Sequence, residues 1–238
     1  MKKVISFLIF ILLFVACVNE IVNVGTNFKH DDIYQYSSKN ALLNNNYTGD
    51  LTVEMIKKNG DFGLGTFNMV DGEMVIFDGN VYQVSITGEL NLMPAKSLSP
   101  FVVTKFFYPD TSFSLPSNIS LDSAKALVNQ IVENLETPLA IKMRGTFNSL
   151  TSRSVKKVPD ESVTLAEIIE NQTKFNFTNV EGTVIGFWFP QYFDGVNFPG
   201  YHLHVLLDDI SGGGHLLDCI FESVIVEIDF ASGVKVDL

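Results

Sequence analysis

The sequence predicts an α/β fold of the α+β kind, in which mixed β-sheets are packed with a few helices. Short runs rich in β-branched and aromatic residues recur in both halves of the chain, bounded by Gly, Pro or Asn. Only three windows combine helix caps with helical apolar spacing. Because 238 residues can bury a substantial core, we expect one domain over residues 34–238, made of two intimately associated β-rich halves at about 34–160 and 161–238.

The first half is predicted to begin with a helix and to continue as strands. Residues 49–60 carry an apolar set and end in a glycine, as short helices do. Residues 74–77 and 81–86 are strand-like and are separated by Asp78-Gly79-Asn80, which is typical of a hairpin turn. Residues 101–108 form a further apolar and aromatic strand.

Two more helices are predicted in the middle of the chain. Ser120 can cap a helix whose apolar residues recur at helical spacing until Pro138 stops it. A strand over residues 139–143 follows. Thr164 and Glu167 form a capping-box pattern at the start of a short helix.

The remainder of the chain is predicted to be β-structure. Pro- and Gly-bearing turns separate its apolar runs, which indicates strands rather than helices. The predicted strands cover residues 183–189, 201–207, 215–221 and 224–230.

Residues 1–17 are interpreted as a secretory signal peptide. Two lysines precede an apolar run that is short for a membrane-spanning helix. A small residue precedes Cys17, as in a bacterial lipobox, so we expect cleavage before Cys17 and a lipid on its thiol, with the protein tethered to a membrane outside the cytoplasm. An ordinary cleaved signal and an uncleaved anchor are the alternatives, and both also predict export. Residues 18–33 would then form a polar linker.

Charge and cysteine content argue against a nucleic-acid-binding protein and against a disulfide-stabilised one. The formal net charge is −11 and the basic residues are scattered, which argues against a nucleic-acid partner. The chain has 2 cysteines, and removal of the signal would leave only Cys219, so no intramolecular disulfide is expected in the mature protein.

A cluster of histidines near the C-terminus predicts a metal site. The chain has 4 histidines, and His202, His204 and His215 fall in one short window. Strand alternation would place His202 and His204 on one face, and the glycines at 212–214 would let His215 return to them. A single strand histidine is more often an ordinary hydrogen-bonded residue, but three in an apolar setting favour metal binding. Three imidazoles form a catalytic zinc set with an open coordination position, although the spacing alone does not name the metal.

Several longer motifs identify a family. In chain order they are Gly-Asp-Phe-Gly-Leu-Gly-Thr-Phe-Asn at 60–68, Val-Asp-Gly-Glu-Met at 70–74, Gly-Thr-Phe at 145–147, Ser-Arg-Ser-Val at 152–155, Gly-Tyr-His-Leu-His at 200–204 and Gly-Gly-His at 213–215. With these motifs the chain resembles the alpha-acetolactate decarboxylases from about residue 34 to its end.

The resemblance implies a zinc enzyme of acetoin biosynthesis that converts 2-acetolactate into acetoin and carbon dioxide. It places zinc-binding, catalytic and substrate-binding roles on matching positions: His202, His204 and His215 for zinc, Glu73 and Arg153 for catalysis, and Thr66 for the pocket. It also implies a homodimer. The family pattern continues past the equivalent of Leu238 with a tail that carries a further active-site glutamate, for which this sequence offers no matching residue.

The substrate explains why these residue types are needed. Acetolactate has a ketone and a hydroxyl oxygen that can chelate one zinc ion, and the metal can stabilise the enediolate that forms as carbon dioxide leaves. We expect Arg153 and Glu73 to orient that enediolate and to deliver a proton to one of its faces.

Two alternatives have to be distinguished from this reading. A cupin-like extracellular metal-binding protein also carries His-x-His on a strand, but it predicts no role for Glu73 or Arg153. A lipid-anchored binding protein descended from the decarboxylase, but catalytically idle, would keep the histidines and lack the activity.

Overall fold

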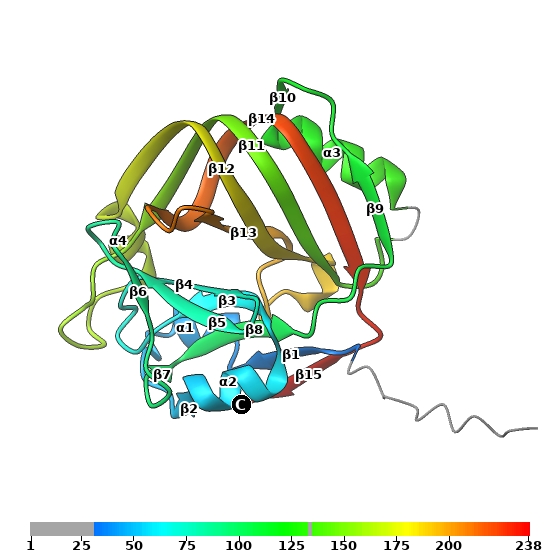
Figure 1. The fold of residues 1–238 in the computed structure, drawn as a ribbon. Helices are drawn as coiled ribbons and strands as arrows, with labels where there is room; N and C mark the ends of the chain where they lie inside the picture. Colours follow the sequence, from blue (N-terminus) through cyan, green and yellow to red (C-terminus); the bar gives the residue numbers. More distant parts are fainter. Residues whose placement is uncertain (1–30, 133–134) are drawn as a thin grey trace, which may run out of the picture.

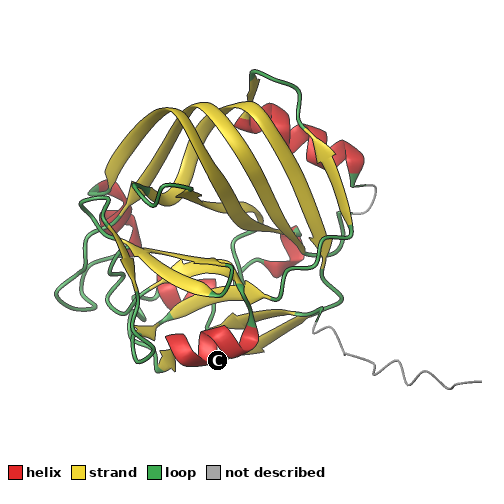
Figure 2. Cartoon of the chain, viewed as in Figure 1, coloured by secondary structure: helices red, strands yellow, loops and turns green. Residues whose placement is uncertain are grey.

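The computed structural model describes residues 31–132 and 135–238, in which two β-sheets face each other and short helices pack on them (Figures 1 and 2). The predicted α+β class is confirmed. The expected signal peptide with Cys17, and most of the expected linker, lie outside the described residues. Within the described part, no helix is long and apolar enough to cross a membrane.

The first sheet comes almost wholly from the first half of the chain. Its order is β15-β1-β8-β3-β4-β5-β6, seven strands among the described residues, with β15 parallel to β1 and the other pairs antiparallel. The strands are β1 (Ile33–Tyr36), β3 (Phe62–Thr66), β4 (Glu73–Phe77), β5 (Asn80–Val84), β6 (Leu90–Leu92), β8 (Phe101–Lys105) and β15 (Val234–Asp237). A small sheet pairs β2 (Leu51–Thr52) with β7 (Leu98–Ser99).

The second sheet closes on itself. β11 pairs with β12, β12 with β13, β13 with β14, and β14 with β11, all antiparallel. The long strands bend strongly, and they arch over the first sheet in Figure 1. The strands are β9 (Thr111–Ser114), β10 (Ile119–Ser120), β11 (Leu139–Ser154), β12 (Thr173–Phe189), β13 (Gly200–Leu207) and β14 (Gly213–Phe230), with β9 and β10 added along β14.

The three predicted helices are present, and two of them begin at the predicted caps. In α2 (Val53–Asn59) the N-cap is Thr52, so the predicted helix starts a few residues later than expected and ends before Gly60. In α3 (Leu121–Ile131) the Ser120 hydroxyl accepts from the third residue of the helix. In α4 (Leu165–Glu170) both halves of the predicted capping box are formed. Helix α1 (Lys39–Leu43) and a 3₁₀ turn (Gln191–Phe193) were not predicted.

Several predicted strands differ from the observed ones. The strands expected at 215–221 and 224–230 form one strand, β14, because neither Gly nor Pro separates them and the ladder with β11 continues across register shifts at Phe147. The strands expected at 139–143 and 183–189 are parts of the longer β11 and β12. Strand β3 was not predicted, because its glycines are uncommon in strands. The structure explains one of them: a Cβ at Gly63 would lie 2.3 Å from the Val103 carbonyl oxygen of β8.

The sheets do not coincide with the two expected halves of the chain. The boundary near residue 160 falls after β11, which belongs to the second sheet, and β15 returns from the C-terminus to the first sheet. The expected hairpin over 78–80 is present, with Asp78 and Gly79 at φ 49° and 71°.

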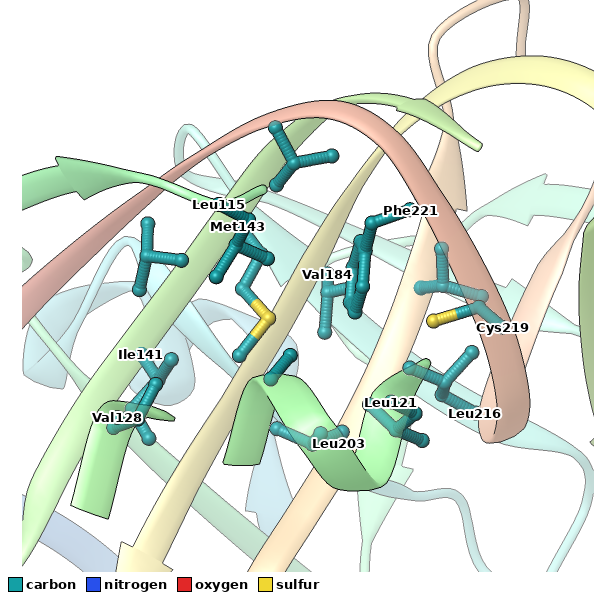
Figure 3. Close-up of a cluster of buried hydrophobic side chains, with 14 of the residues drawn as sticks. Leu115, Leu121, Val128, Ile141, Met143, Val184, Leu203, Leu216, Cys219 and Phe221 are labelled. Carbon is teal, nitrogen blue, oxygen red and sulfur yellow. The ribbon is translucent and has the colours of Figure 1, made fainter. Parts of the chain in front are cut away.

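Two apolar cores determine which way β13 presents its side chains. One core lies between α3 and the curved sheet and contains Leu203, Leu207 and Val128, the first and last of which are labelled in Figure 3. The other lies between the two sheets and contains Leu206 and Phe187. Because side chains alternate along a strand, the even-numbered residues of β13 point toward the first sheet.

Candidate active site and metal centre

The structure brings the three histidines of the predicted metal site together. His202 and His204 share the face of β13 that points toward the first sheet, and His215 on β14 is the direct partner of His204 in the ladder. The three ring centroids lie 5.1 to 5.2 Å apart. The chain returns through a turn at residues 208–211, in which Ile210 has φ 61°, and not through the expected glycines, since Gly213 and Gly214 already lie in β14. Gly214 has φ 116°, and a Cβ there would lie 2.4 Å from the Arg153 carbonyl oxygen.

The histidine nitrogens suit a metal ion. His204 Nδ1 donates a hydrogen bond to the Met74 carbonyl oxygen at 2.7 Å, which leaves the lone pair of Nε2 free. That Nε2, His202 Nδ1 and His215 Nδ1 are buried with no hydrogen-bond partner among the described residues. One ligand atom from each ring lies within 4.8 Å of the others. Buried, unpaired imidazole nitrogens in this arrangement fit a zinc-type site.

Burial keeps these imidazoles neutral, which is the form that ligates metals. Loss of hydration, reinforced by the charge of Arg153, lowers the pKa of His202 to about 3. Burial also holds the pKa values of His204 and His215 well below the usual range. Protons therefore do not compete for these three nitrogens near neutral pH.

Glu73 and Arg153 meet at this cluster. Glu73 is the first residue of β4, and its Oε1 accepts a hydrogen bond from Arg153 Nη1 at 2.6 Å while its Oε2 lies 3.4 Å from His204 Nε2. Arg153 on β11 is the direct ladder partner of His215. Burial raises the pKa of Glu73, and the positive charge of Arg153 opposes that rise. The hydrogen-bonded Glu73–Arg153 pair therefore lies against the histidines.

Thr66 also lies in this region. It is the ladder partner of Glu73 between β3 and β4, and its hydroxyl donates to the Gly72 carbonyl oxygen at 2.7 Å. The hydroxyl thus fixes the turn that leads into Glu73.

A cavity of about 330 Å³ opens beside these polar groups. Glu73, Arg153, Thr66 and two of the histidines form its polar end, and apolar residues form most of the rest of its wall, together with Gly65 and Tyr201. The apolar residues are Leu42, Val70, Phe101, Val155, Leu165, Ile168, Ile169 and Phe198. The ring of Phe198 packs edge-on against His202, with centroids 5.6 Å apart. Sequence reasoning missed this wall, because such residues have the same pattern as ordinary core positions.

Comparisons with known proteins point to the same family as the sequence motifs. The family model described as alpha-acetolactate decarboxylase matches residues 33–238. The alpha-acetolactate decarboxylase of Brevibacillus brevis is 37% identical over 82% of this chain and 69% of its own length. The one of Methanosarcina mazei is 35% identical over 92% of this chain and 76% of its own length.

Two solved structures of this family are similar to the chain in fold. Acetolactate decarboxylase from Bacillus subtilis subspecies spizizenii superposes with a TM-score of 0.85 at 34% identity, over 87% of this chain and 89% of that one. Alpha-acetolactate decarboxylase from Bacillus subtilis strain 168 gives 0.83 at 33% identity, over 87% and 88%. The chain belongs to the alpha-acetolactate decarboxylase family.

Proposed function

We propose that the protein decarboxylates 2-acetolactate to acetoin and carbon dioxide, with a zinc ion held by His202, His204 and His215. The observation that carries the proposal is the meeting of three histidines, each with a buried ring nitrogen that has no hydrogen-bond partner, with the Glu73–Arg153 pair at the polar end of one cavity. The names of the relatives support the reaction, and the histidine donor set supports the metal.

The metal supplies one part of the chemistry. Zinc held by His202, His204 and His215 would supply Lewis acidity toward the negative charge that develops on the substrate as carbon dioxide leaves. The hydrogen bond from His204 to the Met74 carbonyl oxygen leaves Nε2 as the atom of that ring that would hold the metal.

The side chains beside the histidines supply the rest. When the bond to the carboxylate carbon breaks, its electron pair moves toward the ketone, and the carbon that carried the carboxylate must then gain a proton. Glu73 and Arg153 border the cavity together with His202 and His215. We assign them the orientation of the enediolate and the delivery of that proton to one face. The apolar wall excludes water and accepts the methyl groups of the substrate.

The assay that tests this proposal measures acetoin from racemic acetolactate. Purified protein with zinc should form acetoin well above the spontaneous rate. Zinc bound at one ion per chain without acetoin formation would instead support the catalytically idle binding protein. The cupin-like alternative assigns no role to Glu73 or Arg153, so activity that depends on both residues argues against it.

Export and assembly are further proposals. We propose that the chain is exported, that Cys17 carries a lipid, and that two copies form a homodimer. Metabolic labelling with an alkynyl fatty acid should mark the intact protein and not a Cys17→Ser variant. Light scattering coupled to size exclusion should give twice the mass of one chain.

A further inference from the structure

Two buried serines flank Arg153 on β11. Ser152 and Ser154 are both 0% exposed. Since side chains alternate along a strand, their hydroxyl groups leave the strand on the side opposite to the Arg153 side chain. Each hydroxyl donates to a main-chain carbonyl oxygen of a different strand.

Ser152 fastens β11 to the strand of the third histidine. Its Oγ donates to the Gly213 carbonyl oxygen at 2.6 Å. Gly213 lies two residues before His215, and the intervening Gly214 approaches the Arg153 carbonyl oxygen too closely for any side chain. The bond therefore acts where the main chains of β11 and β14 approach each other closely.

Ser154 fastens β11 to the sheet that carries the glutamate. Its Oγ donates to the Val84 carbonyl oxygen at 2.6 Å. Val84 on β5 is the direct ladder partner of Glu73 on β4. The hydroxyl of Ser154 thus reaches the main chain directly beside the residue whose carboxylate Arg153 contacts.

The ladder of β11 is irregular here on its β14 side, whereas the ladder with β12 continues to Ser154. The β11–β14 pairing shifts register between Thr151 and Ser152, and it ends at Arg153 and His215. A register shift of this kind re-aims side chains and removes ladder hydrogen bonds. The hydroxyl of Ser152 adds a contact on the side where the pairing with β14 is interrupted, and that of Ser154 adds one to the first sheet.

We infer that Ser152 and Ser154 are positioning residues that hold Arg153 in register with His215 and with Glu73. The inference rests on the proposed function, because Arg153 and Glu73 are given the task of orienting and protonating the enediolate. Neither serine is among the residues that line the cavity, so each acts through Arg153.

The test compares Ser152→Ala and Ser154→Ala with Ser154→Thr, which keeps a hydroxyl, and with a matched control. In the control, Thr104→Val, the lost hydroxyl is also buried and also donates to a main-chain carbonyl oxygen, that of Phe62 at 2.9 Å. Each variant is assayed for kcat, KM, zinc content, melting temperature and the enantiomeric excess of acetoin.

The serine-to-alanine variants should keep zinc and KM while kcat falls by about 10- to 100-fold, since small misplacements of a catalytic group cost that much. The enantiomeric excess of acetoin should fall as well, because a displaced proton donor no longer favours one face. Thr104→Val should leave kcat and enantiomeric excess unchanged, and Ser154→Thr should retain most of both.

Three kinds of result would overturn the inference, and they distinguish its failure from a failure of the proposed function. Unchanged kcat and enantiomeric excess in both alanine variants would overturn it while leaving the proposed function intact. Loss of zinc, or a melting temperature far below that of Thr104→Val, would assign the serines to folding instead. No acetoin from the unaltered, zinc-loaded chain would overturn the proposed function and the inference with it.

Discussion

Glu73 Oε1 and Arg153 Nη1 form a hydrogen-bonded ion pair of 2.6 Å, although the two residues are 80 positions apart in the chain. Glu73 comes from the first sheet and Arg153 from the second. His204, also in the second sheet, donates to the carbonyl oxygen of Met74 in the first. The site therefore exists only where the two sheets meet, and neither sheet contains it alone.

Replacing Glu73 by glutamine tests the proton-transfer role. Glu73→Gln keeps the size of the side chain but removes the carboxyl group, so kcat should fall by about 10²- to 10⁴-fold, the usual worth of general acid–base catalysis. Zinc content should remain at the level of the unaltered protein, because the three histidines are untouched. The measurement is steady-state acetoin formation together with metal analysis.

The same variant can contradict the assignment. If His204→Ala abolishes activity while Glu73→Gln does not, Glu73 has no part in proton delivery. Arg153→Lys serves as the companion variant: it keeps the charge but loses the planar guanidinium, so it should lower kcat without releasing zinc.

Removing one histidine should release the metal. In His215→Ala, a coordinating nitrogen is lost, and zinc affinity should fall by more than the roughly 10- to 100-fold that loss of an outer-shell partner costs. The control is Cys219→Ala, which removes the buried free thiol of the described residues, a soft metal ligand outside the cluster. Metal analysis after dialysis should give zinc in the control only. Equal zinc in both variants would place the metal elsewhere.

The sequence predicted the local features well. The caps of α2, α3 and α4 and the hairpin at Asp78-Gly79 depend on residues close together in the chain, and the structure has all of them. The convergence of the histidines was also predictable, because strand alternation and a short return of the chain bring them together, although the return is made by residues 208–211 and not by the glycines.

The remainder depends on long-range packing. Nothing in the residues around Glu73 or Arg153 shows that β4 and β11 come together; only the family motifs pointed to both. The closure of the second sheet through the pairing of β13 with β14, and the length of β14, follow from register with distant strands. The cavity wall looks like core in the sequence, because its residues are apolar and regularly spaced.

The core between the sheets should be critical for stability. Phe187 is 0% exposed and its ring contacts the ring of Phe62, with centroids 6.0 Å apart. Phe187→Ala should lower the free energy of unfolding by about 3–5 kcal/mol through lost burial and a residual cavity. Ile225→Ala, at a residue that is 54% exposed, should change it by less than about 0.5 kcal/mol. Urea titration followed by fluorescence measures both, and equal losses would contradict the packing described.

Breaking a buried ion pair should lower the stability of the fold by an amount that depends on pH. Lys105 and Asp229 form an ion pair in which both side chains are 0% exposed. Burial raises the pKa of Asp229, and the hydrogen bond from Lys105 opposes that rise. Lys105→Met should therefore lower the free energy of unfolding by about 3–5 kcal/mol at about pH 8, because the buried carboxylate of Asp229 is left without its counter-charge.

The sign of the pH effect follows from linkage. In Lys105→Met the pKa of Asp229 should rise further in the folded state. The folded protein then binds more protons than the unfolded chain, so the loss of stability should become smaller as the pH falls toward about 6. The control is Lys58→Met, in an exposed pair with Glu54, with an expected change within about 1 kcal/mol and no such trend. Urea unfolding at both pH values tests this, and a defect that grows on acidification would contradict the account.

The most direct test of the central claim is a zinc titration of the metal-free protein. Chelator-treated protein should form acetoin only at the spontaneous rate, and activity should rise linearly with added zinc until one ion is bound per histidine cluster. His204→Ala should show neither tight binding nor recovered activity. Full activity in metal-free protein, or one bound zinc ion per chain without any acetoin above the spontaneous rate, would contradict the account.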